Sequence, residues 1–169
     1  MKSPGDLPLK FIADNMLGKL TRWLRILGQD VKYTAKFVDS ELLKIADNEK
    51  RVLLTRDFML YKRSITNGLD AYYFEGTLLS DCLSELVTRY HLPLVLDITN
   101  IRCSLCNNKL KSVTKAEIQK NLKENTIFYY NKFWKCPGCN QVYWFGSHWK
   151  QINKTLNQIN LKNDDTSEK

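Results

Sequence analysis

Four cysteines form two closely spaced pairs in the second half of the chain. Cys103-Ser-Leu-Cys106 and Cys136-Pro-Gly-Cys139 each place two residues between their thiols, so one tight turn can direct both sulfurs at a single ion. Two such turns complete a tetrahedral set of four thiolates, which is typical of a structural zinc site. A rubredoxin-like iron site uses the same ligands, because softness alone does not separate the two metals. We predict one structural zinc ion, with iron as the alternative.

The insert between the two pairs is long, and one further cysteine stands apart from them. Twenty-nine residues separate Cys106 from Cys136, which exceeds the usual zinc-ribbon spacing. We expect the insert to form a long hairpin or to carry a helix near Thr114–Asn125. Cys82 lies within a helical pattern and is predicted to be a small buried core residue.

Three aspartates occupy similar places in the first half of the chain. Asp14 and Asp57 each end a predicted strand, and Asp39 begins a predicted helix. In an open parallel sheet, acids at the carboxyl ends of the strands can converge although they are far apart in sequence. Converging carboxylates repel one another unless a cation holds them, and Mg²⁺ or Mn²⁺ prefers such oxygen ligands. The alternative is structural, since Asp14 and Asp39 could cap helices and Asp57 could be a turn acid.

The positive charge of the chain is concentrated beside the cysteines. The net charge is +8, and residues 98–150 hold 9 Lys and Arg against 2 Asp and Glu, whereas residues 1–97 hold 14 against 13. A basic, aromatic segment favours contact with a polyanion, and single-stranded RNA fits because its exposed bases can stack on aromatic rings. A solvated lysine-rich surface is the alternative.

Individual residues can be assigned to RNA contacts on the same grounds. Lys19, Arg22 and Arg25 follow one another at steps of three on a predicted helix, away from its leucine stripe, and Arg56 adjoins Asp57. These four side chains are predicted to meet phosphates, with an exposed basic helix face as the alternative. In the ribbon-like segment, the predicted contacts are Trp144, His148 and Trp149. His148 could also be an extra metal ligand or a packed core residue.

Apolar periodicity predicts the elements that must position these side chains. Strands are expected at Lys10–Asp14, Val31–Ala35, Arg51–Asp57 and Ala71–Glu75, and helices at Asn15–Gly28, Asp39–Asn48 and Leu79–Tyr90. This alternation favours an α/β fold with a parallel sheet and right-handed crossovers.

The organisation along the chain follows from these patterns. We expect an α/β domain over residues 1–97, a zinc-ribbon-like module over residues 98–150 and a flexible polar tail over residues 151–169. No apolar run reaches the length of a membrane span, and the first residues lack the apolar stretch of a signal peptide. A soluble, cytoplasmic protein without membrane contact is therefore expected, in which thiols stay reduced.

Several of these motifs together resemble a known family. The runs FIADNMLGKLTRWLRILGQDV, DSELLKIA and RVLLTRD, with the cysteine pairs and VYWFGSHW, are similar to the Mut7-C group of PIN-like proteins over roughly Phe11–Trp149. The resemblance implies a PIN-like fold, a C-terminal zinc ribbon and metal-dependent ribonuclease activity. It also implies that Asp14, the D-x-x-L acid Asp39 and the T-x-D acid Asp57 are the catalytic residues.

The chain departs from the PIN pattern at one acid. PIN nucleases commonly carry a further Glu or Asp between the first acid and the D-x-x-L acid, and residues 15–38 hold only Asp30, which is expected in a turn. The resemblance therefore implies three protein acids, with Glu41 as a helper, and leaves the number of ions open. The leading interpretation is a metal-dependent endoribonuclease whose ribbon grips RNA. The alternatives are a non-catalytic RNA-binding or RNP assembly adaptor and an electron carrier at the four-cysteine site.

Overall fold

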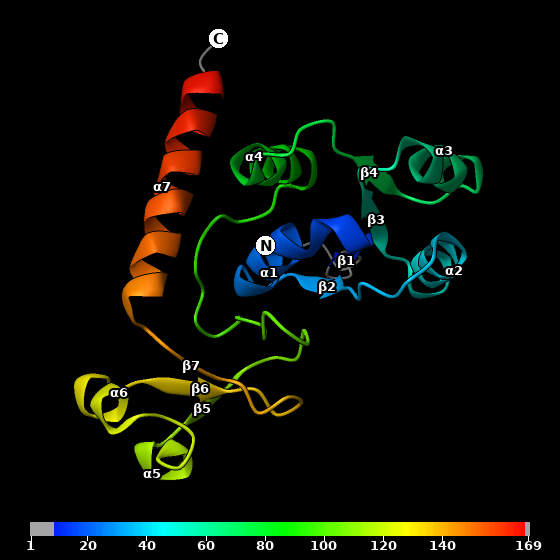
Figure 1. Cartoon of the computed structure of the whole chain (residues 1–169). Helices are drawn as coiled ribbons and strands as arrows, with labels where there is room; N and C mark the ends of the chain where they lie inside the picture. Colours follow the sequence, from blue (N-terminus) through cyan, green and yellow to red (C-terminus); the bar gives the residue numbers. More distant parts are fainter. Residues whose placement is uncertain (1–8, 168–169) are drawn as a thin grey trace, which may run out of the picture.

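The chain folds into an α/β unit, a small cysteine-bearing sheet and a long C-terminal helix (Figure 1). The computed structural model describes the backbone of residues 9–167 and the side chains of residues 9–160 other than His148. No helix within this part of the chain is both long and apolar enough to cross a membrane.

Four parallel strands form the sheet of the α/β unit in the order β2-β1-β3-β4. Their bounds are β1 Lys10–Ala13, β2 Asp30–Lys32, β3 Val52–Thr55 and β4 Ala71–Tyr73. The connecting elements are a short 3-10 helix, η1 Asn15–Leu17, followed by α1 Gly18–Ile26, α2 Asp39–Glu49 and α3 Phe58–Thr66, while α4 Leu79–Tyr90 follows β4. The predicted α/β class with a parallel sheet is confirmed.

Different helices cover the two faces of this sheet. Phe11 and Ala13 of β1 pack in one core with residues of α1 and α4, whereas Ile12 packs in a second core with residues of α2 and α3. The division follows from strand geometry, because successive side chains point to opposite faces. With both faces covered, the central strands are buried and their carboxyl ends form the accessible edge at which predicted site residues lie.

A second, antiparallel sheet carries the cysteines. Its strands, in the order β5-β6-β7, are β5 Lys111–Val113, β6 Phe133–Lys135 and β7 Val142–Trp144. Two short helices, α5 Lys115–Ile118 and α6 Glu124–Tyr129, occupy the connection between β5 and β6. The insert between the cysteine pairs therefore carries helices, which was one of the two structures expected from the sequence.

The prediction of a flexible tail over residues 151–169 is wrong for residues 151–160, whose side chains the structure describes. Helix α7 spans Ser147–Ser167 and packs against α4. Trp149, Ile152, Leu156 and Ile159 join the larger core of the α/β unit, at the spacing of a helical apolar stripe. The core thus crosses the predicted boundary at residue 97, because burying these four side chains outweighs the polar character of the segment.

Candidate metal centre and candidate active site

The two cysteine pairs sit in loops of nearly identical backbone structure. In the first loop, Cys103 N donates to Asn108 O at 2.8 Å and Asn107 N donates to Cys103 O at 2.9 Å. The second loop repeats this pattern, with Cys136 N donating to Gln141 O at 2.9 Å and Asn140 N donating to Cys136 O at 3.0 Å. The residue after each second cysteine is an asparagine with positive φ, 71° at position 107 and 61° at position 140, a conformation that asparagine tolerates well. Each loop thus turns tightly enough to aim both sulfurs inward.

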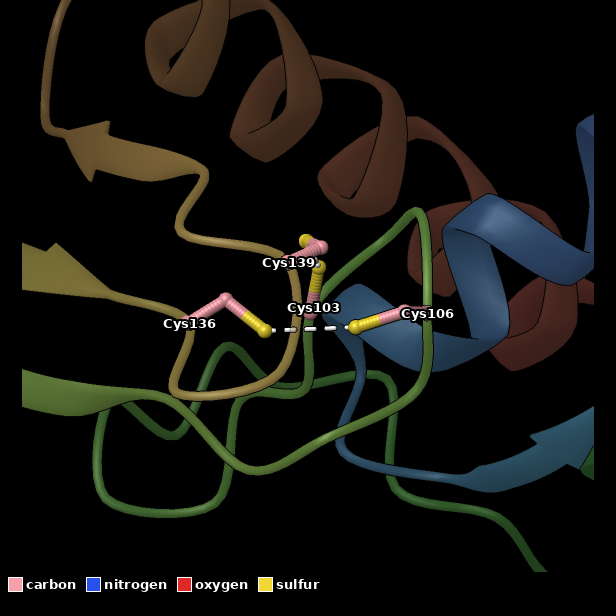
Figure 2. Close-up of side chains that lie close together, drawn as sticks. All are labelled: Cys103, Cys106, Cys136 and Cys139. Atoms are coloured by element: carbon pink, nitrogen blue, oxygen red, sulfur yellow. Dashed lines mark hydrogen bonds between the residues drawn. The ribbon is translucent and has the colours of Figure 1, made fainter.

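The four sulfurs converge between the two loops (Figure 2). All four Sγ atoms lie within 4.8 Å of one another, with Cys103 and Cys139 at 3.5 Å and Cys106 and Cys136 at 3.2 Å. All four are free cysteines rather than disulfides. A tetrahedral zinc site with Zn–S bonds of about 2.3 Å has sulfurs about 3.8 Å apart, so the cluster fits such an ion. The four predicted cysteines can hold a metal ion.

The thiols of this cluster do not ionise alike without a cation. Desolvation within the cluster and the hydrogen bonds of the neighbouring thiols raise the pKa of Cys139, an exposed residue, to about 12, and burial raises the pKa of Cys136. Burial opposes ionisation of Cys106 as well, but hydrogen bonds from Asn108 outweigh it and lower the pKa of this thiol to about 6. Four neighbouring thiolates therefore require a cation to balance their charge.

A buried arginine of the α/β unit holds the first cysteine loop. Arg25 is 3% exposed, and its Nε and Nη2 donate to Val31 O at 3.0 and 2.8 Å. Its Nη1 donates to the carbonyls of Ser104 and Leu105 at 3.1 and 2.9 Å, the two residues between the first pair of cysteines. This corrects the prediction that Arg25 meets RNA phosphates. Arg25 follows Lys19 by six residues, which places the two side chains about 120° apart around the helix axis. The three basic side chains therefore do not share one face.

Asp30 makes the second connection between the α/β unit and the cysteine loop. Its carboxylate accepts from Arg51 Nη1 and from Asn107 Nδ2, each at 2.8 Å, and lies 3.6 Å from Arg102. Burial opposes ionisation of Asp30, but the bond from Arg51 leads the contacts that lower its pKa. Asp30 begins β2, at the sheet edge opposite the carboxyl ends of the strands, and so does not supply the missing PIN acid.

Replacing Arg25 by alanine is expected to lower the free energy of unfolding by at least about 2 kcal/mol, because buried carbonyls lose a charged donor. The matched control is Arg22→Ala, an exposed arginine on the same helix, which should change stability by no more than about 0.5 kcal/mol. Denaturant unfolding of the metal-loaded variants measures both. Equal, small losses would show that Arg25 does not secure the loop.

At the carboxyl edge of the parallel sheet, Thr55 links two of the predicted acids. Its Oγ1 donates to Asp14 Oδ2 at 2.8 Å and accepts from Asp57 N at 2.9 Å. Asp14 is 5% exposed, and its Oδ1 accepts from Asn15 N at 2.6 Å. Asp57 caps α3, because its Oδ1 accepts from Met59 N and Leu60 N at 2.7 and 3.0 Å. The role of Thr55 was missed from the sequence, although the T-x-D spacing was its signal.

The third acid lies on a neighbouring helix and has a different partner. Asp39 is the first residue of α2 rather than its cap, which is Val38, and its Oδ2 accepts from Arg63 of α3. Glu41, the predicted helper, accepts from Val38 N at 3.1 Å. Among the described side chains, which do not include His148, the four cysteines are the one group of three or more Cys, His, Asp or Glu ligand atoms gathered closely enough for an ion. The catalytic roles of the three aspartates therefore stay predictions.

Of four other predicted RNA contacts, two are exposed and two are half-buried. Lys19 and Arg22 are exposed. Arg56 Nη2 donates to Thr77 O at 3.1 Å, and its buried Nε has no hydrogen-bond partner within the described residues. Trp144 is half-buried beside Tyr130, with ring centroids 6.4 Å apart.

The structure also corrects the predicted RNA contact at Trp149. Trp149 is 7% exposed and packs edge-on against Phe145 in the core of the α/β unit, so it offers no face to an RNA base. The side chain of His148 lies outside the described residues. Cys82 is 1% exposed, which confirms it as a core residue.

Comparison with known proteins gives one match. The model of a family described as the Mut7-C RNAse domain matches residues 9–156, a range that includes both sheets, the four cysteines and the three aspartates. No curated protein and no solved structure matches the chain.

Proposed function

Because the chain belongs to the Mut7-C RNAse domain family, we propose that it is a metal-dependent endoribonuclease with its active site at the carboxyl edge of the parallel sheet. Asp14, Asp39 and Asp57 are the proposed ligands of Mg²⁺ or Mn²⁺, and zinc is the proposed occupant of the cysteine site. The observation that carries the proposal is the bridge through Thr55, which brings the strand-end acids of β1 and β3 to one side chain. Thr55 contacts the carboxylate of Asp14 and the backbone N of Asp57, and carboxylate oxygens are the ligands that hard divalent ions prefer.

The free oxygens at this edge are consistent with the proposal. The described hydrogen bonds to the Asp57 side chain end at Oδ1, so the cap leaves Oδ2 available for an ion. Asp39 is about half exposed, and so is its partner Arg63, whose side chain is 48% exposed. A bound divalent ion would supply an activated water and neutralise charge on the phosphate. The protein residues would fix that ion and, through Thr55, the orientation of Asp14.

RNA is the proposed substrate, and single-stranded RNA is favoured. Lys19 and Arg22 are exposed on α1, which follows η1 and Asp14 directly, so they are the proposed phosphate contacts beside the acids. The basic module that contains β5, β6 and β7 is the proposed second binding surface for the same RNA strand.

A second candidate function is a non-catalytic RNA-binding or RNP assembly adaptor. The observation in its favour is that Asp14 and Asp57 both accept backbone hydrogen bonds of helix starts. Under this alternative the acids stabilise the fold and need no divalent ion.

The two functions differ in their response to chelation. The zinc-loaded chain is incubated with an internally labelled, unstructured RNA before and after removal of free divalent ions, and then with Mg²⁺ or Mn²⁺ restored. Internal cuts that disappear on chelation and return with either ion are expected. Cleavage that survives complete removal of these ions would contradict the proposed chemistry, whereas ion-independent RNA binding without cleavage would favour the adaptor.

A further inference from the structure

The insert between the cysteine loops displays two aromatic rings to solvent. Phe128 and Tyr129 of α6 are 78% and 74% exposed, the highest fractions among the large apolar side chains described. The rings pack edge-to-face with centroids 5.3 Å apart. Leaving two aromatic rings in water forgoes the free energy that their burial would contribute, which is an unusual feature for so small a module.

The exposure of these rings is not due to a poorly packed insert. Ile118 of α5 is fully buried against Phe133 and Val142 of the second sheet, and Leu122 and Tyr130 pack around this cluster. The insert is therefore anchored on both sides of α6, and the aromatic pair projects from a packed base.

Charged and amide side chains line a hollow beside the first ring of the aromatic pair. A hollow of about 720 Å³ adjoins Phe128, and its polar lining consists of Lys115, Lys120, Gln119, Asn125 and one acid, Glu124. Over residues 111–135 the chain holds 6 Lys against 2 Glu, and Thr114 engages one of these acids, Glu117, through its backbone N–H and its hydroxyl. No ion pair engages Lys120 within the described residues, so this ammonium is available to an anion.

We propose that Phe128, Tyr129 and the surrounding lysines form a platform that binds single-stranded RNA. Aromatic faces accept unpaired bases, lysines meet the phosphates, and the amides of Gln119 and Asn125 can bond to base edges. A protein partner fits less well, because two lysines line the hollow and the cores of protein interfaces are depleted of lysine. The inference deepens the proposed function and rests on it, since it places the grip of the ribbon on α6 rather than on Trp149.

The platform lies far from the proposed cutting site, which defines the substrate further. The first cysteine loop contacts Gly28 and Asp30, at the starts of the parallel strands, whereas Asp14 and Asp57 follow strand ends. The starts and the ends of the strands lie at opposite edges of a parallel sheet. Figure 1 shows α5 and α6 next to the second sheet, on its side away from α2 and α3. An RNA that uses both sites must therefore be extended and long enough to pass along the molecule.

The test measures RNA binding separately from cleavage. Anisotropy of a fluorescein-labelled, unstructured single-stranded RNA is followed with the zinc-loaded chain in the absence of Mg²⁺ and Mn²⁺. Phe128→Ala/Tyr129→Ala should weaken binding by at least about fivefold for each ring removed, because each stacked base is lost. Phe128→Tyr/Tyr129→Phe keeps both rings and should bind as the parent does. Since α6 buries no side chain, metal content and thermal stability should stay unchanged in both variants.

The possible outcomes distinguish the platform from the proposed function. Unchanged affinity in the alanine variant, or equal affinity of the parent for a duplex of the same length, overturns the platform and leaves the nuclease proposal standing. Loss of affinity in the alanine variant alone supports the platform, even if the parent cleaves no RNA when the divalent ion is restored.

Discussion

Removing the metal from the cysteine site is expected to unfold the second sheet and to loosen the part of the α/β unit that holds it. The buried core of the ribbon is small, with Ile118, Phe133 and Val142 as its fully packed residues. Metal binding to such modules contributes on the order of 10 kcal/mol to folding. Without the ion, β5, β6 and β7 should therefore lose their protection against hydrogen exchange.

The effect should extend into α1 and β2 because of the buried contacts of Arg25. When the first loop opens, Arg25 Nη1 loses both carbonyl acceptors, and Asp30 loses Asn107 as a donor. A buried charged group without its partners is strongly unfavourable. The sequence had suggested separable modules, whereas these contacts predict that metal loss also lowers the thermal stability of the α/β unit.

Cys136→Ser and chelated parent protein provide the two measurements. Elemental analysis of the parent should give about one zinc per chain, as expected for four thiolate ligands, and hydrogen exchange should report protection segment by segment. Cys82→Ala is the matched control, because this buried cysteine lies in the α/β core and should leave the metal content unchanged. Iron at the same stoichiometry, or full protection of α1 after metal loss, would contradict the prediction.

Local patterns allowed much of the fold to be predicted from the sequence. The range Leu79–Tyr90 was predicted for α4 and found, because an amphipathic stripe identifies a helix directly. The four expected parallel strands were also found, although each is shorter than expected. The sulfurs within each cysteine pair were predictable because the C-x-x-C turn is itself a local structure, and the two pairs meet as their shared ligand chemistry predicted.

The errors arose where tertiary packing decides the outcome. Helix α3 was missed, since several of its apolar side chains, including Phe58, Met59 and Ile65, remain exposed and blur the periodicity. The apolar stripe of α7 was overlooked because the polar residues at the end of the chain suggested a flexible tail. Arg25 looked like a surface cation, and its burial becomes favourable through the carbonyl of Val31 together with two carbonyls of the docked cysteine loop.

Replacing Asp57 by asparagine is expected to lower RNA cleavage by at least about 100-fold and to leave stability nearly unchanged. Loss of residues that merely orient metal ligands typically costs 10- to 100-fold, and a direct ligand should cost more. An asparagine amide oxygen can still accept the bonds from Met59 N and Leu60 N, since asparagine caps helices as well as aspartate does. The substitution therefore removes the charged second oxygen while it keeps the cap.

Asp57→Ala separates the two roles of this side chain. It should show the same loss of cleavage and, in addition, a loss of about 0.5–2 kcal/mol in the free energy of unfolding, because the cap is gone. Asp47→Asn is the matched control: its carboxylate is exposed in the last turn of α2 and pairs with Lys50. This variant should cleave RNA as the parent does.

The most direct measurement of the proposed activity is the single-turnover rate of RNA cleavage at saturating Mn²⁺ for the zinc-loaded parent, Asp57→Asn and Asp47→Asn. The account predicts a rate for Asp57→Asn at least about 100-fold below the parent, with an equal thermal midpoint, and a rate for Asp47→Asn equal to that of the parent. Equal rates for all three proteins, or no divalent-ion-dependent cleavage by the parent, would contradict the assignment of the active site to the carboxyl edge of the parallel sheet.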